Sequence, residues 1–320
     1  MSASSPLATW GRLARLSLLP SALADAVAGL ALGGVGAFPQ ASLVVPTLAA
    51  SACVYHGGMV LNDWADRAED ARTRPDRPIP SGAVTPQAAL VAGIGLLAAA
   101  VLLAALANAA LWMAGLVALV LAYDFVGRGP WRGPLLLGAC RAANLGFGIH
   151  VAQRAGSGFG ESIDWAPAIV ALYFLYVVSA SRVARLEDAS DDSAVGSTPR
   201  TYLSLAALAL LAVPWVHVAD GPQWPSLAPF ALVMLGSIAL FNEARRPGPL
   251  TRADAGRATG VALRRLIVFT AAVTLCAGGT RSVLDGLFTL SAKSDCTWAA
   301  LAILSGFPLS AALRKVFPPT

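Results

Sequence analysis

The sequence has little charge and few cysteines. Asp, Glu, Lys and Arg make up 13% of its 320 residues, whereas 56% are hydrophobic and the mean hydropathy is +0.65. Because a soluble domain carries about 25% charged residues, this composition argues against a soluble fold and indicates a polytopic membrane protein. The four cysteines lack the spacing of a metal or redox motif. We therefore expect them to be packing residues.

The net charge of +5 does not indicate nucleic-acid binding. The arginines are scattered among loops between apolar stretches, which membrane topology explains better. The first apolar stretch is longer than a signal peptide core and lacks a small-residue cleavage site. We therefore expect no cleavable signal peptide.

Ten apolar stretches of roughly membrane length follow a polar lead at residues 1–15. Some are short, and the last two are separated by a mixed segment. The sequence therefore predicts an all-α membrane bundle of nine to ten transmembrane helices in a single domain, residues 1–320. The stretches cover approximately residues 16–37, 41–61, 87–107, 109–126, 135–153, 166–184, 202–219, 226–242, 261–280 and 297–314.

The distribution of basic residues predicts the orientation. With a cytoplasmic N-terminus, the loops place all but four of the 23 Lys and Arg residues on the cytoplasmic side. The exceptions are Arg141, inside a stretch, and Arg154, Arg281 and Lys293. This asymmetry satisfies the positive-inside rule. We expect a multi-pass inner (plasma) membrane protein with the loops at 62–86 and 182–200 in the cytoplasm.

The first of these loops begins with a dense acidic cluster. Asp63, Asp66 and Asp70 are spaced i, i+3 and i+7, and Asn62, Asp66 and Asp70 follow at successive i+4 steps. On a helix, either set places oxygen donors on one face, and Mg²⁺ takes such ligands. The alternative is a solvated charged segment whose residues pair with one another.

A second acidic cluster follows the sixth stretch. Asp188 and Asp192 are spaced i, i+4, and Glu187 and Asp191 form an offset pair with the same spacing. Each cluster follows an apolar helix and precedes Gly and Pro residues. The two halves of the chain therefore look like a diverged repeat.

Carboxylates from two clusters at one membrane face could hold Mg²⁺ together with the phosphates of a substrate. Arg72, Arg74 and Arg77 follow the first cluster and would donate charge-assisted hydrogen bonds to the same phosphates. A polyprenyl diphosphate fits, since it has a diphosphate head and an apolar tail. The positive charges would stabilise the departing diphosphate while an allylic cation develops at C1.

The first cluster resembles a signature of the UbiA superfamily of intramembrane prenyltransferases. The matching residues are Asn62-Asp63-x-x-Asp66-x-x-x-Asp70, followed by Arg74-Pro75-x-Arg77-Pro78-Ile79-Pro80-Ser81-Gly82. Asp188-x-x-x-Asp192, before Gly196 and Thr198, resembles the second signature, with a departure in the glycine spacing. Tyr123 to Arg128 matches a Tyr and basic residue of the family. Ala24-Asp25 and Cys140 to Asn144 look most like the EboC-like branch.

The resemblance implies a UbiA-like fold and Mg²⁺-dependent transfer of a polyprenyl group from a polyprenyl diphosphate to a small acceptor within the membrane. The acceptor could be aromatic, a quinone precursor, or a polyol or sugar. A non-catalytic protein of the same fold, which binds or transports an isoprenoid lipid, is the alternative.

The resemblance also implies the site residues. Asp66, Asp70, Asp188 and Asp192 would be catalytic and, with Asn62, would hold the Mg²⁺. The substrate-binding residues predicted from the motifs are Asp63, Arg72, Arg74, Arg77, Arg128, Arg141 and Asn144.

Several polar residues lie within apolar stretches, where ionisable groups are costly. Arg141 and Asn144 could line a cavity, or Arg141 could pair with Asp25 or Asp124 as a structural bridge. We expect His56 to be a packed histidine rather than a residue that contacts the acceptor. Tyr173 and Tyr176 could shield an allylic cation or anchor the helix at the membrane interface.

Overall fold

The computed structural model describes residues 5–33, 40–127, 129–155, 165–185, 198–218, 227–247, 251–277 and 292–317. Within these ranges the regular elements are helices, and no strand is present. The elements are α1 (Pro6–Leu13), the 3-10 helix η1 (Leu16–Leu18), α2 (Leu19–Gly33), α3 (Ala41–Ala65), α4 (Arg67–Thr73), α5 (Pro86–Leu106), α6 (Ala110–Val126), α7 (Arg132–Arg154), α8 (Ala166–Ala184), α9 (Thr198–Val218), α10 (Leu227–Ala244), α11 (Arg252–Ala277) and α13 (Ala292–Val316).

Each of the predicted apolar stretches forms a helix. In the described ranges, eight helices are long and apolar enough to cross a membrane: η1 with α2, then α3, α5, α7, α8, α9, α11 and α13. The two remaining stretches form the shorter apolar helices α6 and α10. The prediction of an all-α membrane bundle is therefore confirmed.

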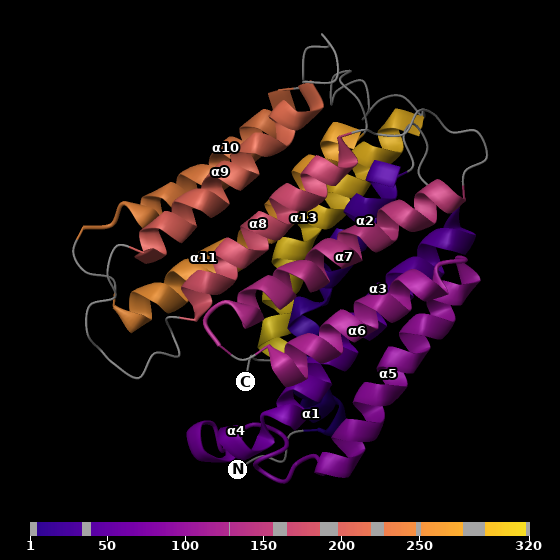
Figure 1. The fold of residues 1–320 in the computed structure, drawn as a ribbon, viewed down its shortest axis with the longest axis vertical. Helices are drawn as coiled ribbons and strands as arrows, with labels where there is room; N and C mark the ends of the chain where they lie inside the picture. Colours follow the sequence, from indigo (N-terminus) through magenta and orange to yellow (C-terminus); the bar gives the residue numbers. More distant parts are fainter. Residues whose placement is uncertain are drawn as a thin grey trace.

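Helices α2 and α7 lie side by side in the middle of the bundle (Figure 1). Residues of both helices belong to two large buried clusters. One cluster joins them to α8, α9, α10, α11 and α13, and the other joins them to α3, α5 and α6. The central pair thus connects the N-terminal group of helices to the C-terminal group.

Glycines allow the close contact between α2 and α7. A Cβ atom built on Gly29 would lie 2.1 Å from the Leu145 carbonyl oxygen, and one on Gly148 would lie 2.5 Å from the Ala26 carbonyl oxygen. Neither position has room for a methyl group, so the backbones pack directly against each other.

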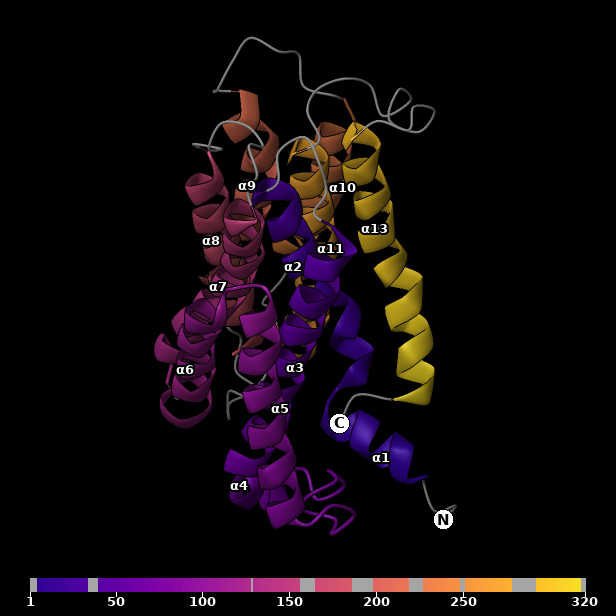
Figure 2. The ribbon, with the colours of Figure 1, turned by 90° about the vertical axis from the view of Figure 1, so that its right-hand side faces the viewer.

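Helices α1 and α4 lie at the same end of the bundle (Figures 1 and 2). Ring contacts and hydrogen bonds join the ends of three further helices there. The Trp64 and Phe125 rings, at the ends of α3 and α6, have centroids 6.3 Å apart. Arg185, just after α8, donates a hydrogen bond of 3.2 Å to the carbonyl of Gly127, just after α6. The chain segments that follow α3 and α8 therefore begin at the same end of the helix bundle.

Candidate active site

The first acidic cluster lies where α3 passes into α4. Asp66 ends α3, and its backbone N–H donates to the Asn62 carbonyl at 2.9 Å. The Asp70 N–H then donates to the Asp66 carbonyl at 2.9 Å. Helical i+4 bonding thus continues through the junction and keeps Asn62, Asp66 and Asp70 at successive turns.

Arg77 joins two buried carboxylates of this cluster. Its Nη1 lies 2.7 Å from Asp70 Oδ2 and 3.3 Å from Asp63 Oδ1. Arg15, between α1 and α2, adds a third contact, with its Nη2 2.9 Å from Asp63 Oδ1. Asp63, Asp70 and Arg77 are all buried. The prolines after α4 thus turn the chain so that a cation compensates two carboxylates removed from water.

The other two arginines of the predicted diphosphate site lie outside this buried network. Arg72 and Arg74 are exposed. The Nη1 of Arg74 is 3.9 Å from Asp70 Oδ1, at the edge of ion-pair distance. Of the three arginines, the structure therefore places Arg77 inside the cluster, Arg74 at its margin and Arg72 on the surface.

Asn62 and Asp66 are half-buried and lie near a carboxylate from another helix. The Asn62 side chain donates a hydrogen bond to Asp124 of α6, and Asp66 is within electrostatic range of it. Asp124 is only 4% exposed, and its Oδ2 is buried without a hydrogen-bond partner. From the sequence, Asp124 is one of two candidate partners of Arg141, but Arg141 pairs with Asp25. The position of Asp124 in an apolar stretch is a functional signal, but that position does not reveal its neighbours.

The second acidic cluster, with Asp188 and Asp192, lies outside the described residues, as does Arg128. Their flanks are described: Arg185, just after α8, donates a hydrogen bond to the carbonyl of Gly127, just after α6. In the ranges that the structure covers, no group of three or more His, Cys, Asp or Glu side chains could hold a metal ion. Asn62, Asp66 and Asp70 would thus need additional ligands to complete a metal site.

Arg141 belongs to a buried polar network between α2, α7 and α8. Its Nη2 lies 3.0 Å from Asp25 Oδ1 and 3.1 Å from the Tyr173 hydroxyl. Tyr173 also donates to Asp25. The Asn144 amide donates to the Asp25 carboxylate at 3.5 Å and accepts a bond of 3.0 Å from Ser51. The structural bridge expected for Arg141 thus forms with Asp25.

A mostly apolar pocket lies between α3, α6 and α7. It contains about 480 Å³ of empty space, part of which is open to the exterior. Its polar lining residues are Tyr55, Tyr123, Asp124, Cys140, Arg141 and Asn144. Arg141 and Asn144 therefore line a cavity as well as forming the buried network, so the two hypotheses for them are compatible.

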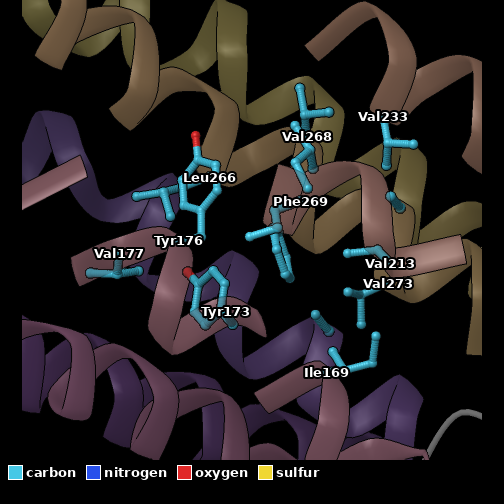
Figure 3. Packing of buried hydrophobic residues seen from close by; sticks show 14 of the residues in the cluster. Ile169, Tyr173, Tyr176, Val177, Val213, Val233, Leu266, Val268, Phe269 and Val273 are labelled. Carbon is cyan, nitrogen blue, oxygen red and sulfur yellow. The ribbon is translucent and has the colours of Figure 1, made fainter. Parts of the chain in front are cut away.

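The two tyrosines of α8 are core residues. The ring centroids of Tyr173 and Tyr176 lie 5.0 Å and 5.6 Å from that of Phe269 (Figure 3). Tyr176 donates a 2.7 Å bond to the Ala262 carbonyl. Both side chains are fully buried, so the alternative of membrane-interface anchoring is wrong. His56 is also buried, with its Nδ1 2.7 Å from the Ala14 carbonyl oxygen, as a packed histidine would be.

Comparisons with known proteins identify the family. Residues 22–263 match the UbiA prenyltransferase family. The chain belongs to this family. A digeranylgeranylglyceryl phosphate synthase of Methanopyrus kandleri is 30% identical over 218 residues, which are 62% of this chain and 76% of the relative. A 4-hydroxybenzoate octaprenyltransferase of Pseudomonas fluorescens is 32% identical over 144 residues, 44% of this chain and 47% of the relative.

Solved structures share the UbiA fold. A digeranylgeranylglyceryl phosphate synthase structure has a TM-score of 0.61 and 17% identity. The match covers 85% of this chain and 98% of the synthase chain. A UbiA homologue from Archaeoglobus fulgidus bound to GPP and Mg²⁺ has a TM-score of 0.55 and 15% identity. The match covers 83% of this chain and 99% of the homologue. The predicted fold and the prediction of a UbiA-type prenyltransferase are therefore confirmed. The names of the two curated relatives refer to different acceptors.

Proposed function

We propose that this UbiA-family protein transfers a polyprenyl group from a polyprenyl diphosphate to a small acceptor, in a divalent-cation-dependent reaction within the membrane. The observation that carries this proposal is the arrangement at the α3–α4 junction. Oxygen donors and a buried arginine lie there next to an apolar pocket. Both parts of the substrate, an anionic head and an apolar chain, thus have a complementary environment.

The chemistry of the donors fits Mg²⁺, which prefers carboxylate and amide oxygens and completes its coordination with substrate phosphates. Asn62 and Asp66 are half-buried and accessible to a cation. Asp70 is held by Arg77 and would join them when the cation competes with that arginine. Asp188 and Asp192 would supply the remaining ligands. Bound Mg²⁺ would neutralise charge that builds up on the diphosphate leaving group.

Arginines of the chain would bind the diphosphate. Arg77 is positioned by two carboxylates, which orient its guanidinium before the substrate arrives. Arg74 and Arg72, at the exposed side of the cluster, would contact the outer phosphate, with Arg128 supplying a further positive charge. These contacts strengthen as the carbon–oxygen bond breaks, because negative charge then moves onto the diphosphate.

The pocket between α3, α6 and α7 would hold the reacting end of the prenyl chain. Val54, Met59, Leu116, Val120 and Leu137 give it an apolar lining. Such a lining excludes water, which would otherwise capture the allylic cation before the acceptor does. The aromatic rings of Tyr55 and Tyr123 are placed to stabilise positive charge through their faces.

The site would open to the cytoplasmic side of the inner membrane. Basic residues support this orientation, since Arg67, Arg72, Arg74 and Arg77 all lie at the end of the bundle that carries α4. Water-soluble diphosphate would then enter and leave through the cytoplasm, while the prenyl chain stays among the helices.

Diphosphate release by the purified protein tests the function. We expect release from geranylgeranyl diphosphate to require Mg²⁺ and an acceptor pool from a cytosolic extract. Asp66→Asn should lower the rate by about 100-fold or more, and Glu69→Gln, on the exposed side of α4, is the matched control. Tight binding of the diphosphate without release in any extract would instead favour a non-catalytic lipid-binding protein.

A further inference from the structure

Three arginines, Arg264, Arg265 and Arg314, gather where α11 packs against the last turns of α13. Arg264 of α11 is within electrostatic range of its neighbour Arg265 and of Arg314 in the last turn of α13. Arg264 and Arg314 are exposed. Arg265 is half-buried, and its Nε has neither solvent contact nor a hydrogen-bond partner. Because like charges held close together repel one another, an anion bound within this arginine cluster would stabilise it.

Carboxylates of the helices that pack against α11 do not neutralise the arginine cluster. Asp25 of α2 is held by an arginine of α7. Glu243 of α10 and Asp254 of α11 itself both pair with Arg257. Helices α8 and α9 contain no Asp or Glu, and Asp295 lies in the first turn of α13, at the opposite end from the cluster. Among the described residues, the arginine cluster therefore has no anionic partner.

The two arginines of α11 lie inside its membrane-spanning part. Arg257 contacts Glu243, close to the end of α10, at 3.3 Å. Arg264 follows Arg257 by about two helical turns. A Cβ atom built on Gly236, about two turns before the end of α10, would lie 3.7 Å from Arg265 Cγ. An unpaired charge at this depth is costly, and such residues commonly serve a binding function.

The Arg264 side chain extends back along α11 toward its start. A Cβ atom built on Gly260, one turn earlier, would lie 3.4 Å from Arg264 Nη1, so glycine leaves room for the guanidinium there. Long basic side chains in spans take such directions to bring their charge to the lipid headgroups. A Cβ atom on Gly306 of α13 would lie 3.6 Å from Ile267 of α11. Because Arg314 follows Gly306 and Arg264 precedes Ile267, the two arginines project toward the same end of these antiparallel helices.

Exposed apolar side chains flank the arginine cluster. Leu263 precedes Arg264, and Leu309 and Val316 lie on α13 on either side of Arg314. Helix α13 lies at an edge of the bundle beside α11 (Figure 2). This part of the surface therefore combines positive charge with apolar residues that would face the membrane. A ligand that matches it has an anionic head and apolar chains.

We propose that the arginine cluster binds the phosphate of an anionic membrane phospholipid, with the acyl chains along the exposed apolar residues of α11 and α13. The phosphate would accept charge-assisted hydrogen bonds from Arg264 and Arg314, and Arg265 would add positive charge. A zwitterionic phospholipid would fit less well, because its ammonium group is repelled by the arginines. The site uses no residue of the proposed prenyl-transfer site, so it does not rest on that function.

Lipid binding to the purified protein in detergent, measured by native mass spectrometry, tests this site. Dioleoylphosphatidylglycerol and dioleoylphosphatidylcholine share their acyl chains and phosphate but differ in net charge. We expect the wild-type protein to bind the phosphatidylglycerol at least about tenfold more tightly. The expectation follows because each arginine near an anionic headgroup strengthens binding by roughly fivefold.

Arg264→Gln combined with Arg314→Gln should reduce this preference to about threefold or less, because two charges of the cluster are removed. The matched control combines Arg154→Gln with Arg245→Gln, which removes two exposed charges at the ends of α7 and α10. This control should keep the wild-type preference. If the first double variant does not fold, Arg314→Gln alone replaces it and should lower the preference by at least about threefold.

sn-Glycerol 3-phosphate distinguishes a lipid from a soluble phosphate ester. At a concentration equal to that of the phosphatidylglycerol, it should not displace the lipid, because it has no acyl chains to pack against α11 and α13. Displacement would overturn the lipid assignment in favour of a soluble ester. Equal binding of the two lipids by the wild-type protein, or an unchanged preference in Arg264→Gln with Arg314→Gln, would also overturn the proposal.

Discussion

At the scale of single residues, Arg77 is the side chain that compensates most of the buried negative charge near the first motif. It lies between Asp63 and Asp70 and is itself buried. Removing one partner of a buried ion pair leaves an uncompensated charge, which costs roughly 3–5 kcal/mol. Arg77→Ala should therefore lower the thermal unfolding temperature in detergent by several degrees.

Arg72→Ala is the matched control for Arg77→Ala, since Arg72 lies five residues earlier on the exposed side of α4. Its unfolding free energy should change by less than about 0.5 kcal/mol. Equal unfolding temperatures for the two variants would show that Arg77 does not stabilise the cluster.

The Asp25–Arg141 pair gives a second prediction about single residues. Asp25 is fully buried and accepts hydrogen bonds from Arg141, Asn144 and Tyr173. Asp25→Leu alone would leave the Arg141 charge without its partner, whereas Asp25→Leu combined with Arg141→Met removes both charges. We expect the double variant to unfold at a higher temperature than Asp25→Leu. A double variant less stable than either single variant would contradict this.

For the first motif, the sequence predicts which residues follow at successive helical turns better than it predicts which residues from other helices they contact. Helical periodicity places Asn62, Asp66 and Asp70 at successive turns, and the backbone hydrogen bonds have this arrangement. The contact between Asn62 and Asp124 joins residues far apart in the chain. Local spacing carries no information about such a contact, because it depends on how α3 packs against α6.

At the scale of helices, the contact between α2 and α7 depends on glycine. A methyl group at Gly29 would overlap the Leu145 carbonyl oxygen at 2.1 Å, which is backbone and cannot rotate away. Gly29→Ala should force the two helices apart and destabilise the protein by about 1–3 kcal/mol. Thermal unfolding in detergent would measure the loss.

Gly95→Ala is the matched control, because a Cβ atom there would meet nothing within 4 Å. Alanine has the higher helix propensity, so this variant should be as stable as the wild type or slightly more stable. The close-packing account would be wrong if Gly29→Ala and Gly95→Ala had the same stability.

The sequence predicts the apolar part of each helix and underestimates the polar extensions. The ninth stretch is predicted from residue 261, but α11 begins at Arg252. Thr251 and Asp254 bond reciprocally at its start, with the Thr251 N–H donating to Asp254 Oδ2 at 3.0 Å and the Asp254 N–H donating to Thr251 Oγ1 at 3.2 Å. This capping box stabilises turns that hydropathy alone does not detect.

At the scale of the whole molecule, the sequence predicts both the fold class and the family. The apolar composition indicates a helical membrane bundle, and the long first motif indicates the family. The orientation in the membrane stays a prediction. Cysteine labelling in intact cells would test it with Arg72→Cys in α4 and Arg154→Cys at the end of α7, since both positions are exposed.

We expect a membrane-impermeant maleimide added outside the inner membrane to label Arg154→Cys but not Arg72→Cys. The wild-type protein controls for its own cysteines, of which Cys140, Cys276 and Cys296 are buried and Cys53 is half-buried. Labelling of Arg72→Cys from outside would reverse the predicted orientation of the acidic loops.

The activity proposed for this chain is transfer of a prenyl group at its acidic clusters. The most direct measurement follows deuterated geranylgeranyl diphosphate in membranes that contain the wild-type protein or Asp70→Asn, with mass spectrometry of the extracted lipids. We predict a new deuterated product in wild-type membranes that disappears with EDTA, returns with Mg²⁺ and is absent from Asp70→Asn membranes. The same deuterated product in Asp70→Asn membranes, or its formation in EDTA, would show that the acidic cluster and a divalent cation are not required for transfer.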